Sequence, residues 1–184
     1  MGAVGQHEPW DPRTVGIALA AYQPNPVWLA EQLASIAAQT HTEWICMITL
    51  DSPLEEIRSS PDLASFMHDA RFVWVENPER LGVRSNFQKA TQLLLERDVD
   101  LIAFSDQDDV WLPEKIAESV AAIKARGPLS MVYCDAYLLV EGVTRPERLH
   151  EYTVRTRGEM SIGEQIISPQ VSGFCEVFDA TLAK

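Results

Sequence analysis

The sequence predicts an α/β fold in which helices cover both faces of a mostly parallel sheet. Short apolar runs that do not alternate with polar residues recur along the chain, as is typical of strands buried on both faces. Stretches with apolar residues at helical spacing separate these runs, and Pro, Gly and Asn mark the boundaries. Alternation of strand and helix favours a parallel sheet.

The first strand–helix unit begins with the apolar run 15–21, which Pro24-Asn25-Pro26 ends. Asn25 is a suitable helix cap, and Pro26 fits the first helical turn because its missing N–H has no partner there. The helix that follows has one apolar face, formed by Leu29, Leu33, Ile36 and Ala37.

Later units repeat this order. Strands are expected at 44–50, 72–75, 101–104, 131–134, 137–140 and 174–178. Helices are expected around two apolar stripes, Phe87-Ala90-Thr91-Leu94 and, after Pro113, Ile116-Val120-Ile123. The remaining segments are expected to be a partly helical stretch at 53–69, a mobile charged loop at 142–157 and a short helix at 161–167. The pattern indicates a Rossmann-like domain over residues 14–184, preceded by a disordered leader at 1–13.

The charge balance excludes one class of partner. The chain has 184 residues, with 15 Lys+Arg against 27 Asp+Glu and a formal net charge of −12. Nucleic-acid binding needs a basic stripe, which this sequence lacks, so we expect no nucleic-acid partner. An acidic protein can still bind an anionic phosphate when a metal ion lies between them.

The cysteines and the apolar runs indicate where in the cell the protein is expected. The three cysteines, Cys46, Cys134 and Cys175, are odd in number and widely spaced, so we expect reduced, buried thiols in a cytoplasmic protein. The N-terminus lacks the apolar core of a secretory signal, and no apolar run approaches the roughly 18 residues of a membrane span. We therefore expect a cytoplasmic protein, with peripheral attachment to the inner face of the membrane as the alternative.

Polar residues follow the expected strands at one edge of the sheet. Ligands of open parallel sheets bind beyond the carboxyl ends of the strands. The polar residues at those ends are Tyr22, Asp51, Asn77 and the carboxylates Asp106, Asp108 and Asp109. They are far apart in sequence but would share one rim, and this convergence predicts a binding site.

The carboxylate cluster predicts a divalent cation. Asp106, Asp108 and Asp109 lie within four residues and repel one another, so their burial without a cation would be costly. Mg²⁺ or Mn²⁺ takes oxygen ligands and often uses one or two carboxylates together with substrate phosphates. The non-functional alternative is a solvated loop that caps the next helix.

Two other carboxylate motifs compete for this segment. A calcium-binding EF-hand loop that began at Asp106 would need Gly and Glu where the chain has Trp111 and Ala117. The Asp-x-Asp string of haloacid-dehalogenase-type phosphatases fits Asp106 and Asp108, but that family carries it on the first strand. A metal-dependent phosphohydrolase therefore remains a weaker alternative. Phosphate-binding Gly-rich loops are absent from the sequence, which counts against ATP hydrolysis and dinucleotide redox chemistry.

Four stretches resemble family-two glycosyltransferases. They are Ala20-Ala-Tyr22-Gln-Pro24 with Glu31-Gln-Leu-Ala-Ser-Ile36 and Gln39-Thr40, Asn77-Pro-Glu-Arg-Leu-Gly82-Val-Arg-Ser-Asn86-Phe87, Ser105-Asp-Gln-Asp-Asp-Val-Trp111-Leu-Pro113-Glu-Lys115, and Val171-Ser-Gly173-Phe-Cys. The third is the most specific and is similar to rhamnosyltransferase-like members. The resemblance covers nearly the whole chain and implies the A-type fold of that family.

The resemblance also implies roles for individual residues. Ala20 and Tyr22 would border the nucleotide base, and Asp51 would meet the base or the ribose. Asp106 and Asp108 would form the Asp-x-Asp pair that binds the metal, with Asp108 the main ligand and Asp106 nearer the ribose. Arg84 and Asn86 would approach the diphosphate.

The chain departs from the family pattern in two places. Leu50-Asp51-Ser52-Pro53 stands where the family usually has Asp-Asp-Gly-Ser, so one acid and the Gly are missing. The Glu-Asp or His-Asp motif that supplies the catalytic base is absent after Gly173. We therefore expect the base beyond Lys184 and a chain truncated before its acceptor-binding part.

The sequence as a whole predicts the nucleotide-sugar-binding part of an inverting glycosyltransferase. Its donor would be a UDP- or dTDP-linked sugar, held through Mg²⁺ or Mn²⁺, and its acceptor a glycan or a lipid-linked glycan in bacterial polysaccharide or cell-wall synthesis. The alternative from another functional class is a non-catalytic nucleotide-sugar-binding module.

Overall fold

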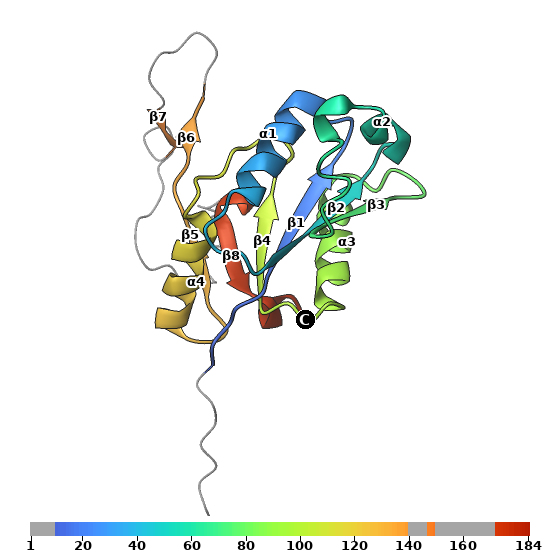
Figure 1. Cartoon of the computed structure of the whole chain (residues 1–184). Helices are drawn as coiled ribbons and strands as arrows, with labels where there is room; N and C mark the ends of the chain where they lie inside the picture. The colour runs from blue at the N-terminus through green and yellow to red at the C-terminus, as the bar shows by residue number, and fades with distance from the viewer. Residues whose placement is uncertain (1–9, 140–146, 150–171) are drawn as a thin grey trace, which may run out of the picture.

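The structure, a computed structural model, describes residues 10–139, 147–149 and 172–184 (Figure 1). Its centre is a six-stranded sheet with the order β3-β2-β1-β4-β8-β5. The strands are β1 (Val15–Ala21), β2 (Trp44–Leu50), β3 (Phe72–Glu76), β4 (Leu101–Ser105), β5 (Met131–Tyr133) and β8 (Glu176–Asp179). Strands β1 to β4 are parallel to one another, whereas β8 is antiparallel to both of its neighbours.

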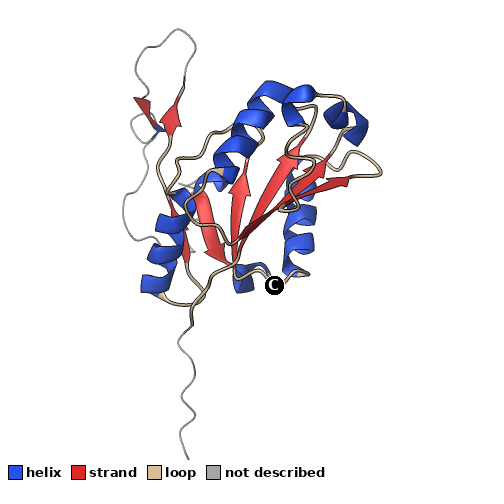
Figure 2. Cartoon of the chain, viewed as in Figure 1, coloured by secondary structure: helices blue, strands red, loops and turns tan. Residues whose placement is uncertain are grey.

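Helices lie on both faces of this sheet, as Figure 2 shows. The helices are α1 (Pro26–Ala37), α2 (Leu54–Arg58), α3 (Val83–Leu95) and α4 (Lys115–Arg126), and the 3-10 turns are η1 (Pro61–Leu63), η2 (Gly173–Cys175) and η3 (Ala180–Ala183). A separate two-stranded sheet pairs β6 (Tyr137–Leu138) with β7 (Glu147–Arg148). The α/β, mostly parallel architecture predicted from the sequence is therefore confirmed.

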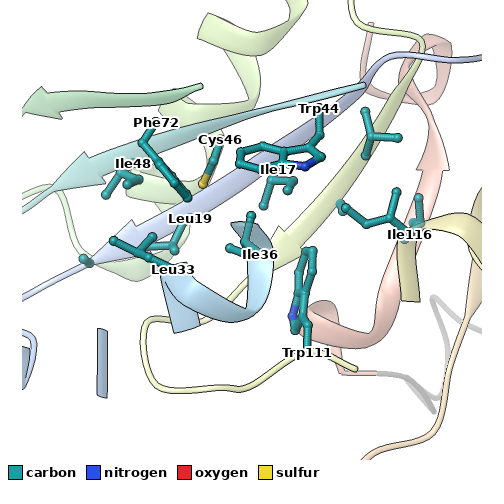
Figure 3. Close-up of a cluster of buried hydrophobic side chains, with 14 of the residues drawn as sticks. Ile17, Leu19, Leu33, Ile36, Trp44, Cys46, Ile48, Phe72, Trp111 and Ile116 are labelled. Carbon is teal, nitrogen blue, oxygen red and sulfur yellow. The ribbon is translucent and has the colours of Figure 1, made fainter. Parts of the chain in front are cut away.

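Two apolar cores lie on opposite faces of the sheet. Alternate residues of β1 divide between them, since Ile17 and Leu19 belong to one core and Ala18 to the other. The first core contains buried residues of α1, α2 and α4, and Figure 3 shows part of it, including Ile17 and Leu19 of β1 and Leu33 and Ile36 of α1. Helix α3 supplies Ala90 and Leu94 to the second core. Burial on both faces explains why the strand sequences are apolar without alternation.

Local sequence sets the helix ends as expected. The Asn25 side chain accepts a hydrogen bond from Val27 N at 3.0 Å and so caps α1, with Pro26 as its first residue. Helix α4 is capped at its C-terminal end by Gly127, whose φ of 94° lies in the region that favours glycine.

The strand register brings the carboxyl ends of the parallel strands to one edge. Ala21 pairs with Leu50, Leu50 with Glu76, and Leu19 with Ser105. The residues that follow these strands therefore begin at nearly the same height along the sheet. We call this edge the rim and define it by residues 22–25, 51–53, 77–82 and 106–112.

The structure corrects several boundaries. Helix α4 begins at Lys115 rather than at Pro113, and the last strand begins at Glu176 because residues 173–175 form the turn η2. The segment expected as a loop at 142–157 contains β7, which pairs with β6. The helix expected at 161–167 lies outside the described residues.

The segment before β1 is also partly described. Residues 1–9 of the expected leader lie outside the described residues. Residues 10–13 run alongside the body of the domain, where Arg13 N donates to Asp100 Oδ2 at 2.8 Å and Asp11 forms an ion pair with Lys124. In the described part of the chain, none of the helices has the length and hydropathy that crossing a bilayer requires.

Candidate functional site

The end of β1 carries an aromatic side chain stacked on a cation. Tyr22 is 39% exposed, and the Arg80 guanidinium lies over its ring at 4.0 Å from the centroid. Such stacking of Arg on an aromatic face is an attractive contact worth about 0.5–1 kcal/mol at exposed sites. The stack leaves an exposed aromatic and a cation together at the rim.

Hydrogen bonds join the β1 end to its two neighbours at the rim. Tyr22 N donates to Gln107 Oε1 at 2.9 Å, and Gln23 N donates to Ser52 Oγ at 3.3 Å. Gln107 belongs to the carboxylate segment after β4, and Ser52 follows β2. The rim loops are therefore tied to one another and not only to the sheet.

Asp51, at the end of β2, organises the loop between β3 and α3. Its Oδ1 accepts from Asn77 Nδ2 at 2.6 Å and from Leu81 N at 3.1 Å, and its Oδ2 accepts from Gly82 N at 2.8 Å. Burial alone would raise the pKa of the Asp51 carboxyl, but these hydrogen bonds and the charge of Arg80 together lower it. Asp51 is thus a carboxylate that holds the loop 77–82.

A buried amide network supports Asp51 from below. Asn86 is 2% exposed, and its Nδ2 donates to Thr49 O at 3.0 Å while its Oδ1 accepts from Asn77 Nδ2 at 2.8 Å. Lys89 Nζ donates to Asn77 Oδ1 at 2.7 Å. Asn86 was expected to approach a diphosphate, but the structure places its amide beneath the rim with donor and acceptor both engaged. It positions Asn77 and Asp51 instead.

The remaining residues singled out at this side lie as follows. Ala20 is half-buried in β1 and pairs with Thr49 of β2, one strand away from the loop 77–82. Arg84 is exposed in the first turn of α3. Neither side chain belongs to the hydrogen-bonded network around Asp51.

The carboxylate cluster lies directly after β4. Asp106 and Asp109 are half-buried and Asp108 is exposed. Burial, followed by repulsion from Asp108, raises the pKa of Asp106. Burial and repulsion from Asp106 and Asp108 raise the pKa of Asp109 to about 6, although the nearby Lys115 ammonium opposes the change. The charged forms of Asp106 and Asp109 are therefore disfavoured in the folded chain.

Asp109 carries an unsatisfied oxygen. Among the described residues its Oδ2 is buried and finds no hydrogen-bond partner. A buried carboxylate oxygen without a donor is costly, and a cation would satisfy it. The described residues contain no group of three or more His, Cys, Asp or Glu side chains arranged to hold a metal ion.

Buried polar side chains of α1 and of Gln39, which follows its C-cap, hold the carboxylate segment in place. Gln32 Nε2 donates to Ser105 Oγ, and Trp111 N donates to Ser35 Oγ at 3.0 Å. Gln39 Nε2 donates to Leu112 O at 2.8 Å, and its Oε1 accepts from Ile116 N at 3.0 Å. These contacts fix both ends of the segment 105–116, so the backbone that carries the carboxylates is rigidly supported.

Lys115 supplies a half-buried cation near Asp106 and Asp109. Its ammonium lies 4.1 Å from the centroid of the Trp111 ring and donates to Phe174 O. Burial lowers the pKa of Lys115, while the neighbouring thiols and the carboxyls of Asp109 and Asp106 oppose that shift. The cation partly offsets the repulsion within the carboxylate cluster.

Several residues of this site were missed by reasoning from the sequence. They are Arg80, Gln107 and the supporting side chains Gln32, Ser35, Lys89 and Lys115. The buried, unpaired oxygen of Asp109 was also not foreseen. For Gln32 and Ser35 a signal existed, since the two polar residues lie at helical spacing on the otherwise apolar buried face of α1. For Arg80 none existed, because its partner Tyr22 is far away in sequence.

Comparison with known proteins shows what this chain is similar to. No family model matches the chain. An uncharacterized glycosyltransferase of Methanocaldococcus jannaschii, MJ1057, is 23% identical over 131 residues, which cover 71% of this chain and 44% of that protein. The chain thus spans less than half the length of that relative.

Solved structures share the fold. S. aureus TarS 1-349 in complex with UDP-GlcNAc superposes with a TM-score of 0.60 at 15% identity, covering 92% of this chain and 46% of the other. The mannosyltransferase PcManGT from Pyrobaculum calidifontis, in complex with GDP-Man and Mn²⁺, gives a TM-score of 0.52 at 20% identity, covering 68% and 36%. The chain therefore has the fold of these glycosyltransferases.

Proposed function

We propose that this chain is the donor-binding part of a glycosyltransferase that binds a nucleoside-diphosphate sugar through a divalent cation. The observation that carries the proposal is the rim. Tyr22, Asp51 and the carboxylates after β4 follow separate strands and meet at one edge, where ligands of parallel sheets bind. The structural likeness to TarS with UDP-GlcNAc and to PcManGT with GDP-Man supports a nucleotide-sugar ligand.

The carboxylates fit a hard divalent cation. Asp109 has a buried oxygen without a donor, and Asp106 and Asp108 supply oxygens beside it. Mg²⁺ and Mn²⁺ prefer oxygen ligands and often complete their shell with substrate phosphates. We assign Asp108 and Asp109 as the main ligands, with Asp106 beside them and nearer the ribose. The Mn²⁺ in PcManGT supports a metal in this fold.

The other rim residues would hold the nucleotide. The Tyr22 ring, with Arg80 stacked on it, offers a flat surface for a base. Asp51 keeps the loop 77–82 in place next to that surface, and Oδ2 still has capacity for a ribose hydroxyl or a base N–H. Arg84, exposed in the first turn of α3 just after the rim, would meet a phosphate.

We infer that transfer inverts the anomeric carbon by direct displacement. A bound metal would neutralise charge on the departing diphosphate. The attacking hydroxyl must lose its proton to a carboxylate base. Asp179 does not fit that role, because it pairs with Leu101 at the opposite end of β4 and its carboxylate accepts from Leu129 N and Thr181 N. We propose that the base belongs to sequence outside this chain, together with the site for a glycan or lipid-linked acceptor.

Calorimetry on the full chain tests the proposal. UDP, dTDP and GDP are titrated in Mn²⁺ and again in a chelator, followed by UDP-GlcNAc, GDP-Man and dTDP-rhamnose. We expect one nucleotide to bind in Mn²⁺ and its affinity to fall in chelator. Losing a charge-assisted contact costs about 1.5–3 kcal/mol, which is roughly tenfold to a hundredfold in affinity.

Matched variants localise the site. Asp108→Asn and Asp109→Asn should each remove most of the Mn²⁺ dependence, because they delete a charged oxygen ligand. Asp98→Asn is the control, since Asp98 is exposed between α3 and β4 at the other end of the sheet. Equal affinity with Mn²⁺ and with chelator, or no binding by a folded sample, would contradict the proposal. If the chain binds a nucleotide but transfers sugar to no acceptor, the proposed donor site stands and the proposal that this chain takes part in transfer fails.

A further inference from the structure

Two cysteines far apart in sequence lie next to each other just beyond the paired ends of β5 and β8, Cys134 after β5 and Cys175 in the turn η2. The pairing of β5 with β8 puts Tyr133 opposite Glu176, so the next pair in the register is Cys134 and Cys175. Cys134 N donates to Cys175 O at 3.1 Å, and the two thiol side chains hydrogen-bond to each other. Their wide spacing in the sequence gave no sign of this contact.

Cross-strand neighbours of this kind are within reach of a disulfide. Opposite residues of an antiparallel pair have Cα atoms about 5.5 Å apart when they are joined by a backbone hydrogen bond. Disulfides usually join Cα atoms about 4.4–6.8 Å apart, so the backbone needs no large movement. Each side chain needs only to turn so that its sulfur meets the other.

One of the two thiols is both reachable and activated. Cys134 is half-buried, whereas Cys175 is buried behind it. The hydrogen bond from Cys175 and the nearby Lys115 ammonium outweigh burial and lower the pKa of Cys134 to about 6. A thiolate at the accessible position and a second thiol in contact with it are the two parts that thiol–disulfide exchange requires.

We propose that Cys134 and Cys175 form a redox-responsive dithiol that closes to an intrachain disulfide on reaction with a small-molecule disulfide. The Cys134 thiolate attacks one sulfur of the oxidant, its S–S bond breaks, and one thiolate leaves. Cys175 loses its proton to solvent and attacks the Cys134 sulfur of the mixed disulfide, which expels the second thiolate. The two cysteines are oxidised by two electrons, and the oxidant is reduced to two thiols.

Lys115 interacts both with the segment that carries this dithiol and with the rim carboxylates. The Lys115 ammonium donates to Phe174 O, next to Cys175, and also acts on Asp106 and Asp109. A disulfide would fix the turn η2 against the end of β5 and remove the thiolate that faces Lys115. The oxidation step itself does not rest on the proposed function, since neither sulfur belongs to the rim.

The test treats the folded full chain with oxidised glutathione, then denatures it and alkylates the remaining thiols. We expect the number of alkylated cysteines to fall from three to one and the intact mass to fall by two hydrogens. Cys46 is the internal control, because it is fully buried in β2 and burial raises the pKa of its thiol far above the usual range. Peptide mapping should link the peptide of Cys134 to that of Cys175.

Three variants make the outcome decisive. Cys46→Ser should still lose two thiols, Cys175→Ser should stop at a stable mixed disulfide on Cys134, and Cys134→Ser should lose none. Before oxidation, Cys134 of the folded wild type should react with iodoacetamide at least about tenfold faster than Cys46. The proposal is overturned if glutathione stays attached to wild-type Cys134, if all three thiols survive, or if the mapped link includes Cys46. These readouts count sulfur atoms, so they stand whether or not a nucleotide binds.

Discussion

Asp109 is a residue whose charged form the folded domain disfavours. Its carboxyl is half-buried, adjoins two other carboxylates, and has one oxygen without a hydrogen-bond partner among the described residues. A domain that keeps such a group sacrifices stability in its apo form. The cost is consistent with a group that binds a cation when the ligand is present.

The pH dependence of stability should report this group. Below 3.8, the ordinary Asp value, the carboxyl is protonated in both states; between there and about 6 the unfolded chain has released its proton while the folded chain retains it. The folded state therefore loses stability as pH rises through this window. Full burial would make such a shift worth about 3 kcal/mol, but partial exposure screens it to about 1 kcal/mol.

Asp109→Asn should accordingly be more stable than wild type by about 1 kcal/mol at pH 7 in chelator, because the amide carries no charge to bury. Near the ordinary Asp value the two proteins should unfold alike. Urea denaturation at the two pH values measures the difference, with Asp98→Asn as the exposed control. If the wild type is as stable as the variant at pH 7, folding does not raise the pKa of the Asp109 carboxyl.

For single residues, the sequence predicted which side chains lie at the rim better than it predicted which residues they contact. Each carboxylate and Tyr22 could be placed at the rim because strand ends are visible as the last residue of an apolar run. The stacking of Arg80 on Tyr22 and the burial of Asn86 could not be predicted. Both depend on how the loop 77–82 folds back over the ends of β1 and β2, which is set by contacts between residues distant in sequence.

The loop between β3 and α3 is the element that completes the rim. It is held by Asp51 through Leu81 N and Gly82 N, and Gly82 adopts φ 80° and ψ 159° before α3 begins. That backbone region is essentially restricted to glycine. Gly127, after α4 at the opposite end of the sheet, has the similar values φ 94° and ψ −175°.

These two glycines form a matched pair for a test. Gly82→Ala and Gly127→Ala should each lower the free energy of unfolding by about 1–3 kcal/mol, because alanine is strained in this region although each added Cβ meets open space. Only Gly82→Ala should also weaken nucleotide binding, since it displaces the N–H that Asp51 accepts. Urea denaturation and calorimetry measure the two effects. Equal loss of binding in both variants would show that the loop has no separate role.

Element order was largely predictable, and strand direction at one edge was not. The parallel strands and the long helices follow from non-alternating apolar runs and helical stripes. Nothing in the short run around Val177 indicates that β8 enters the sheet between β4 and β5, antiparallel to both. A segment as short as Glu176–Asp179 has the same composition in either direction, and its place is decided by the open edge of β4.

At the scale of the whole molecule, β8 is the strand that joins β5 to the rest of the sheet. Strands β1 to β4 form a continuous parallel block, and within the sheet β8 lies between that block and β5. Val177 of β8 lies in the core that α1 and α4 share, while Phe178 lies in the core of α3. The strand therefore contributes to both faces at once, and its removal would expose the backbone edge of β4.

A chain that ends at residue 171 should consequently fail to unfold cooperatively and should associate, because the bare edge of β4 offers unpaired N–H and C=O groups to other chains. The matched control ends at residue 180, which keeps β8 and the hydrogen bond from Ala180 N to Asp100 O. Circular dichroism during heating and size-exclusion chromatography compare the two. The longer chain should melt in one transition as a monomer, since the residues it loses form only part of the turn η3. If the shorter chain melts in the same way and remains monomeric, β4 is a stable edge by itself, and β8 is an addition to a domain that strands β1 to β4 already complete.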